Sequence, residues 1–410
     1  MCRSLSCFCL LSLAVVGGLA AGTPVTEAPV TEESLLAGVD GSHPAARARA
    51  GALGVAEAQR QRAKLLSDPR LEIGREELGD VELETVWGIA WTPPVDGRRQ
   101  WAGRAADAAF QAEKSLFAAS LLDLRREARE SYADWAAGEA RVDILGGHAA
   151  RLAALTERMR RRTEAGEQSR LDAGRLAIAY EGSAADLSEA RAAAAAARAR
   201  MTAWLIEGGL ELSTARPALP ELPEVPGGLD PGLVPNLRAA TSRVEQAAAA
   251  ERLSRRVASA PELLVGWKSV EASGTDLDGP VVAVSWAVPV LDRRRADRMA
   301  AQSAAAVAGA HRDWVTRRAA ADLSAAVAAY EVLRQAALAA SSSRANLDAV
   351  ALAATAAYEQ GETTVTDLLD SLGAVVEARL RALDLYFAAL GAHRQLEVAA
   401  GRPLTSGDLS

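Results

Sequence analysis

The chain has 410 residues, of which 50% are hydrophobic but only 4% are aromatic. This composition suits long helices packed through small side chains better than a thick globular core. The net charge of −7 leaves no basic footprint of the kind that nucleic-acid-binding proteins carry, so no nucleic-acid partner is predicted.

The N-terminus has the features of an export signal. Arg3 supplies a positive charge, residues 5–16 form an apolar run, and small residues around Ala20 offer a cleavage site. We predict a signal peptide over residues 1–21, followed by a flexible segment over 22–41. The alternative, a membrane anchor, fits less well because the apolar run is short for a membrane span. All three cysteines lie in this signal, so the mature chain is predicted to have no disulfide or thiolate site.

Internal landmarks indicate a tandem duplication. The Trp-x-x-Pro-Val element that begins at Trp91 returns at Trp286, and the Gly-Glu pair that begins at Gly166 returns at Gly361. Proline landmarks upstream repeat in the same order, and a repeat of whole units decides the architecture. The predicted divisions are a first repeat at 42–206, a Pro/Gly linker at 207–234, a second repeat at 235–404 and a tail at 405–410.

Each repeat predicts the order helix, strand, strand, very long helix, tight turn, helix. In the first repeat these elements are a helix at 43–66, strands at 70–76 and 81–92, and helices at 98–163 and 168–206. In the second repeat they are strands at 262–271 and 280–288, and helices at 293–357 and 363–400. The long helix at 98–163 would extend roughly 100 Å, and its apolar residues recur every seven positions, as in a coiled-coil seam.

The strands alternate between one apolar face and one small or polar face. Trp91 and Trp286 stand at matched strand ends, where membrane-interface aromatics are found in transmembrane barrels. The alternative is an ordinary half-buried sheet against a soluble core. Four strands per chain cannot close a barrel, and open edges are not tolerated in lipid, so several chains would have to share one barrel.

These landmarks, in this order, resemble the TolC-like family of outer-membrane efflux proteins over about residues 42–404. The resemblance implies a mainly α fold with a small β part, in which tandem-duplicated helical hairpins form the α-barrel of a homotrimer. Each chain would give four strands to a 12-strand transmembrane β-barrel. The implied partners are outer-membrane lipid, a periplasmic adaptor (membrane fusion) protein and an inner-membrane transporter of RND type. The implied location is the Gram-negative outer membrane, extending into the periplasm.

The resemblance also implies site residues near the two glycine turns. The adaptor-docking tips would be Gly166, Glu167, Gly361 and Glu362, and the pore aperture would be formed by Tyr358, Asp367 and Asp370. Two carboxylates repeated about a threefold axis would make a ring of negative charge that favours cations. The alternative is that both aspartates stabilise the first turns of a helix. A glutamate after each tip glycine is closer to the heavy-metal branch of the family, the CzcC and CusC type.

No constellation for catalysis is present in the sequence. The four histidines are far apart, and no glycine-rich phosphate loop follows a strand, so we predict no enzyme, no cofactor and no resident metal. The predicted function is a passive efflux duct that conducts solute, with heavy-metal cations among the candidates, from periplasm to exterior. The alternative is a soluble periplasmic coiled-coil scaffold or adaptor, which explains the export signal and the heptads but not the matched strand pairs.

Overall fold

The computed structural model describes residues 31–39, 43–78, 82–204, 216–256, 259–272, 275–288 and 293–404. The predicted signal peptide and tail, most of the predicted N-terminal segment and part of the linker lie outside these residues. The elements in chain order are α1 (Glu32–Val39), α2 (Pro44–Lys64), β1 (Arg70–Leu78), β2 (Glu82–Trp91), α3 (Arg98–Glu164), α4 (Arg170–Met201), α5 (Pro235–Ser254), β3 (Glu262–Ala272), β4 (Thr275–Ser285), α6 (Arg295–Ser342), α7 (Arg344–Glu359) and α8 (Val365–Ala400), with short 3₁₀ turns η1 (Thr202–Trp204) and η2 (Pro231–Leu233).

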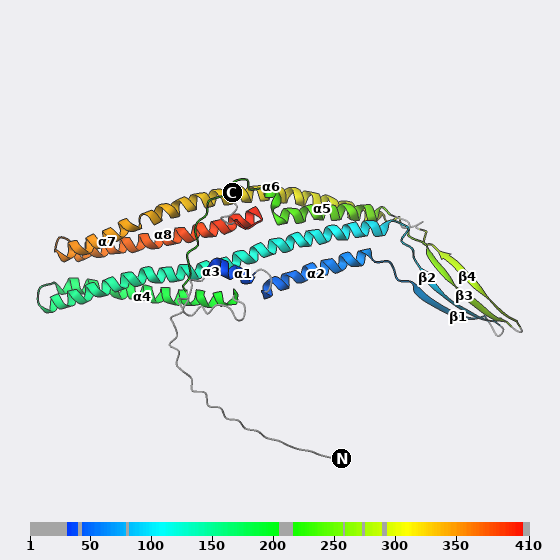
Figure 1. Ribbon diagram of the computed structural model, residues 1–410, viewed down its shortest axis with the longest axis horizontal. Helices are drawn as coiled ribbons and strands as arrows, with labels where there is room; N and C mark the ends of the chain where they lie inside the picture. Colours follow the sequence, from blue (N-terminus) through cyan, green and yellow to red (C-terminus); the bar gives the residue numbers. More distant parts are fainter. Residues whose placement is uncertain are drawn as a thin grey trace, which may run out of the picture.

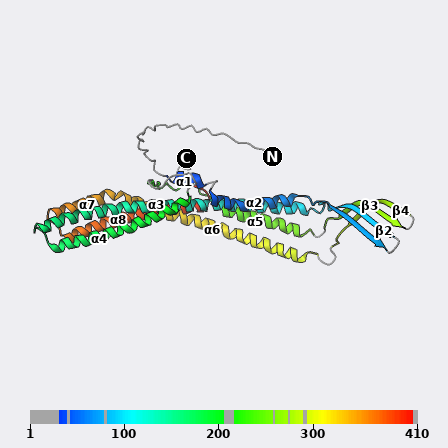
Figure 2. The same cartoon turned by 90° about the horizontal axis from the view of Figure 1, so that it is seen from below.

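The molecule is a long rod with the sheet at one end and two helical hairpins at the other (Figure 1). One hairpin consists of α3 and α4, and the other consists of α7 and α8. Towards the sheet, α3 contacts α2 and α5, and α5 contacts α6, so these helices form one layer in the order α2, α3, α5, α6 (Figure 1). Figure 2 shows the rod from below, with α5 between α2 and α6. The outer sides of α2 and α6 are the two edges of this layer.

The four strands form one antiparallel sheet in the order β1-β2-β3-β4. Each repeat supplies one pair, and the repeats meet where β2 pairs with β3. Trp87 lies opposite Trp267 and Gly88 lies opposite Gly266 at this junction. The predicted fold class is confirmed: a mainly helical chain of duplicated hairpins that carries a four-stranded sheet. The strands β1 and β4 are the edges of that sheet.

The predicted bounds of the last strand were wrong. The sequence suggested 280–288, whereas β4 runs from Thr275 to Ser285 and Trp286 follows it. Asp276, Asp278 and Pro280 disfavour a strand by propensity, but the register with β3 extends the pairing to Thr275. Proline is tolerated here because β4 is an edge strand within this chain.

The long helix predicted at 293–357 is broken into α6 and α7. The break lies at the last of three consecutive serines, Ser343, and the serine hydroxyls donate to carbonyls of the preceding turn. Ser341 donates to Leu338 at 2.8 Å, and Ser342 donates to Ala339 at 2.7 Å. Such bonds compete with the helical ladder and bend helices. The heptad pattern predicted the helical faces, but it carries no information on serine hydroxyls that compete with the helical hydrogen bonds.

Part of the segment predicted to be flexible is helix α1, which packs against α3. Val39 is 1% exposed and joins a core that contains Trp135. Glu32 is buried and forms ion pairs with Arg129 of α3 and Arg394 of α8. The prediction missed this helix because its anchoring partners lie about 100 and 360 residues further along the chain.

The seam predicted on the first long helix is buried as expected, with Leu124, Leu152 and Met159 each at most 3% exposed. The described part of the linker lies against the helices through tyrosine hydroxyls. The Tyr132 hydroxyl donates to the carbonyl of Ala218 at 2.6 Å, and the Tyr330 and Tyr386 hydroxyls donate to prolyl carbonyls in the same way. The extended linker is therefore fastened to α3, α6 and α8.

Candidate functional site

Both glycine turns end their helices in the same way. Gly166 follows α3 with φ +78° and Gly361 follows α7 with φ +77°, a left-handed conformation that glycine adopts without a steric penalty. Each glycine N–H donates to the carbonyl three residues earlier at 3.0 Å, and the next N–H, from Glu167 or Glu362, donates five residues back at 2.9 Å. This is the Schellman motif, and it leaves an exposed glutamate at each tip.

Asp367 closes a capping box at the start of α8. Its N–H donates to the Thr364 hydroxyl oxygen at 3.2 Å, while its carboxylate accepts from the Thr364 N–H at 3.1 Å and from the hydroxyl at 2.6 Å. These bonds hold the pKa of the Asp367 carboxyl below its ordinary value. Asp370 is exposed one turn later and takes no part in the box. The capping role weighed from the sequence is therefore present at Asp367 but not at Asp370.

Tyr358, the third predicted aperture residue, lies against the other hairpin. Its hydroxyl is 3.7 Å from the sulfur of Met159 on α3, and it packs on the core that Leu368 and Val365 of α8 share with α3 and α4. Burial raises the pKa of Tyr358. Within one chain, this side chain therefore contributes to packing between hairpins.

Two polar links join the hairpins near the tips, and the sequence did not reveal them. Arg158 of α3 forms an ion pair with Glu359 of α7. Arg175 of α4 donates to the hydroxyl of Thr366 on α8 at 3.1 Å. The partners are 201 and 191 residues apart, so no local signal connects them. The duplication places Arg175 where the second repeat has Asp370, which makes the two tips chemically unequal.

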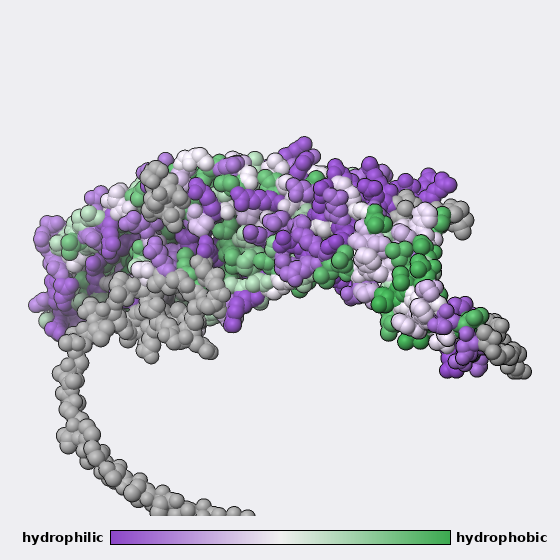
Figure 3. All heavy atoms as spheres, turned by 45° about the vertical axis from the view of Figure 1, so that its right-hand side comes forward, coloured by the Kyte–Doolittle hydropathy of each residue, from purple (hydrophilic) through white to green (hydrophobic). Residues whose placement is uncertain are grey.

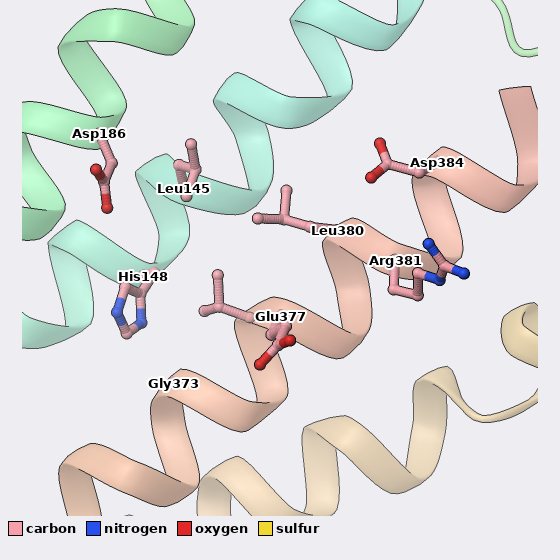
Figure 4. Close-up of a pocket in the computed structure, with 9 residues that line it drawn as sticks. Leu145, His148, Asp186, Gly373, Glu377, Leu380, Arg381 and Asp384 are labelled. Atoms are coloured by element: carbon pink, nitrogen blue, oxygen red, sulfur yellow. The ribbon is translucent and has the colours of Figure 1, made fainter.

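An open groove of about 670 Å³ lies between the first hairpin and α8 (Figure 4). Leu145 and Leu380 supply apolar walls, and Glu377 comes from α8. His148 lies on α3, and burial lowers the pKa of its ring. Within the described ranges, no three His, Cys, Asp or Glu side chains are grouped so that they could hold a metal ion.

The apolar face of the sheet is exposed rather than packed on a core. Trp91 and Trp286, the predicted interface aromatics, are 37% and 54% exposed. Each indole N–H is bonded in the same way, to the carbonyl of Ser67 at 3.1 Å and of Ser259 at 2.9 Å. Two further tryptophans, Trp87 and Trp267, face each other across β2 and β3 on the same side and were not among the predicted site residues. Other exposed members of this face are Leu71, Ile73, Ile89, Leu263, Val265, Val282 and Val284.

No helix within the described part of the chain is both long and apolar enough to cross a membrane. The rod carries an apolar sheet at one end and charged turns at the other, with the 67 residues of α3 between them.

Solved outer-membrane channels share this arrangement of helices and strands. The chain superposes on CusC, from a study of transmembrane channel formation, with a TM-score of 0.76 at 16% identity, covering 91% of this chain and 92% of that chain. For the outer-membrane channel OprN the TM-score is 0.75 at 19% identity, covering 91% and 90%. For the Neisseria gonorrhoeae outer-membrane channel MtrE in its open state the values are 0.72 and 18%, covering 92% and 90%.

These likenesses establish the fold, and they confirm the resemblance to outer-membrane efflux proteins that the sequence suggested. They do not single out the CusC branch, because OprN and MtrE match about as well. No protein-family model and no curated protein matches the sequence.

Proposed function

We propose that this chain is one subunit of the outer-membrane channel of a tripartite efflux system, conducting solute passively from the periplasm to the exterior. The supporting observation is a single layer that is open at both edges. Among the described residues, the strands β1 and β4 have no outer neighbour, and α2 and α6 are the corresponding edges of the helices. Head-to-tail contacts of this kind close into rings. Three copies would bring twelve strands to one barrel, an even number as in bacterial outer-membrane barrels.

The exposed sheet face supports lipid as its environment. Five apolar side chains of this face are each more than half exposed: Trp87, Ile89, Val265, Val282 and Val284. A contiguous apolar surface of this kind marks a membrane or protein interaction site in a folded protein. A soluble periplasmic scaffold, the alternative, would leave this face in water. The proposal assigns the chain no catalytic step.

The implied partners follow from the ends of the rod. The exposed tips at Gly166–Glu167 and Gly361–Glu362 are proposed to dock a periplasmic adaptor, which would connect the channel to an inner-membrane transporter of RND type. Heavy-metal cations are the proposed cargo class, supported by the glutamates of both tips and by Asp370. Asp370 is the stronger aperture candidate of the two aspartates, because the carboxylate of Asp367 already serves the capping box.

Single-channel conductance in a planar bilayer tests the proposal. We expect the purified protein to form cation-preferring pores, Asp370→Asn to reduce that preference, and Asp367→Asn to reduce it less. Asp313→Asn, at an exposed aspartate of α6, is the matched control and should behave as the wild type. A protein that stays in aqueous solution without detergent and forms no pores would refute the channel. Pores whose ion preference is the same in all three variants would refute the aperture residues alone.

A further inference from the structure

The four helix ends that meet the sheet are strongly basic. The ranges 57–69, 96–107, 251–256 and 292–298 hold thirteen arginine or lysine residues and seven aspartate or glutamate residues, although acidic residues outnumber basic ones in the whole chain. These ranges are the end of α2, the start of α3, the end of α5 and the start of α6. We refer to them together as the basic collar. It follows the apolar sheet face directly along the rod (Figure 1).

The collar and the apolar face have a constant spacing in both repeats. Arg98 follows Trp91 by seven positions, and Arg293 follows Trp286 by the same seven positions. Each interval contains an exposed valine, Val95 at 71% exposure in the first repeat and Val288 at 59% in the second. Figure 3 shows the same order on the surface, with hydrophobic residues over the sheet and hydrophilic residues on the helices next to it.

Helix electrostatics account for only part of these charges. Cations stabilise the last turn of a helix and oppose the partial positive charge of the first turn. Arg62 and Arg252 near the ends of α2 and α5 obey this rule. Arg98 opens α3 beside Asp96, with their side chains 3.9 Å apart, and Arg99 donates to the carbonyl of Lys64 at the end of α2. Arg293 and Arg295 precede or open α6, whose first turn has one acidic residue, Asp297. Two exposed arginines at a helix N-terminus oppose its partial positive charge, and their position indicates an anion outside the chain.

Only part of the collar is engaged in ion pairs within the chain. Arg60 and Lys64 pair with Asp107, and Arg255 pairs with Glu251. Several exposed collar residues have no ion pair among the described residues: Arg62, Arg99, Arg104, Arg252, Arg256, Arg293 and Arg295. Arg104 and Arg252 stand on the ring of Trp101, with guanidinium carbons 4.5 and 4.8 Å from its centroid. That contact holds two like charges side by side at the surface.

We propose that the basic collar binds the anionic headgroups of glycerophospholipids in the membrane leaflet that covers the inner part of the apolar sheet face. The inference rests on the proposed function, because the sheet must be in a membrane for the collar to reach headgroups. A basic segment next to a membrane-embedded surface is attracted to anionic lipid, each residue adding to the attraction. The collar therefore fixes the depth of the sheet in the membrane and selects its lipid neighbours.

The test measures lipid selectivity by electron spin resonance. The purified full-length protein is reconstituted in phosphatidylcholine vesicles that contain a trace of spin-labelled phosphatidylglycerol or spin-labelled phosphatidylcholine. We expect the protein to immobilise the phosphatidylglycerol label about fivefold more strongly than the phosphatidylcholine label. Screening at about 0.5 M salt should reduce the preference, because the Debye length falls well below that at physiological ionic strength.

A triple variant Arg256→Gln, Arg293→Gln, Arg295→Gln should lose most of the preference. The matched control is Arg170→Gln, Arg191→Gln, Arg317→Gln, which removes three exposed arginines far from the sheet and should keep it. Equal immobilisation of both labels by the wild type, or an equal loss in both triple variants, would overturn the collar and leave the channel intact. If neither label is immobilised by the wild type, the protein is not in the bilayer and both proposals fail.

Discussion

The junction between the repeats should not tolerate a side chain at Gly266. A Cβ at this position would stand 2.7 Å from the Cα of Gly88 and closer still to the carbonyl oxygen of Trp87. Both neighbours are backbone atoms of β2, so relief requires β2 and β3 to separate. Overpacking of this kind costs about 1–3 kcal/mol, and each ladder hydrogen bond lost adds about 1 kcal/mol. We therefore expect Gly266→Ala to destabilise the sheet by about 2–4 kcal/mol.

Gly74→Ala is the matched control, because a Cβ at Gly74 of β1 meets nothing within 4 Å. Replacing glycine in a strand should even stabilise the fold by about 0.5–1 kcal/mol. The assay is the urea concentration that unfolds the detergent-extracted protein, together with the yield of folded material. Gly266→Ala should lower both, and Gly74→Ala should leave both unchanged or raised. Equal behaviour of the two variants would refute the close approach of the strands at this junction.

Three further changes test other parts of the rod. Gly361→Ala puts a Cβ in open space at φ +77°. Urea unfolding should therefore show only the backbone penalty of about 1–2 kcal/mol. A larger loss of unfolding free energy would argue against the turn. His393 is buried, and its pKa is lowered from 6.5 to about 4, mainly by desolvation and also by the charges of Arg129 and Arg394. The free energy of unfolding should therefore fall as the pH drops from about 6.5 to about 4. Thermal unfolding of His393→Leu should lack that fall in stability, and an unchanged pH profile would rule out His393 as its source. Glu32→Gln leaves buried Arg394 without its partner and should cost about 3–5 kcal/mol of unfolding free energy, whereas exposed Glu33→Gln is the control and should cost nothing measurable.

Much of the fold could be predicted from the sequence because each feature occurs in both repeats. The two Gly-Glu turns were predicted from their repetition, and the structure forms them with the same hydrogen bonds and the same left-handed glycine. The alternation that led to Trp91 and Trp286 also contains Trp87, and Trp267 was within reach by the same reasoning. What the sequence could not supply was pairing between distant positions, such as Arg158 with Glu359 or Glu32 with Arg394.

At the candidate aperture, the duplication does not predict the side-chain chemistry. The repeats share a backbone at the tips, but Arg175 and Asp370 occupy equivalent positions, and only the second repeat has the capping box between Thr364 and Asp367. A carboxylate that satisfies a helix N-terminus is partly neutralised by the N–H groups it faces. The exposed charge that remains for a passing cation is therefore greater at Asp370 than at Asp367, although the motif made them look alike. The charges at this end of the rod depend on residues that differ between the repeats, whereas the backbone of the tips is the same in both.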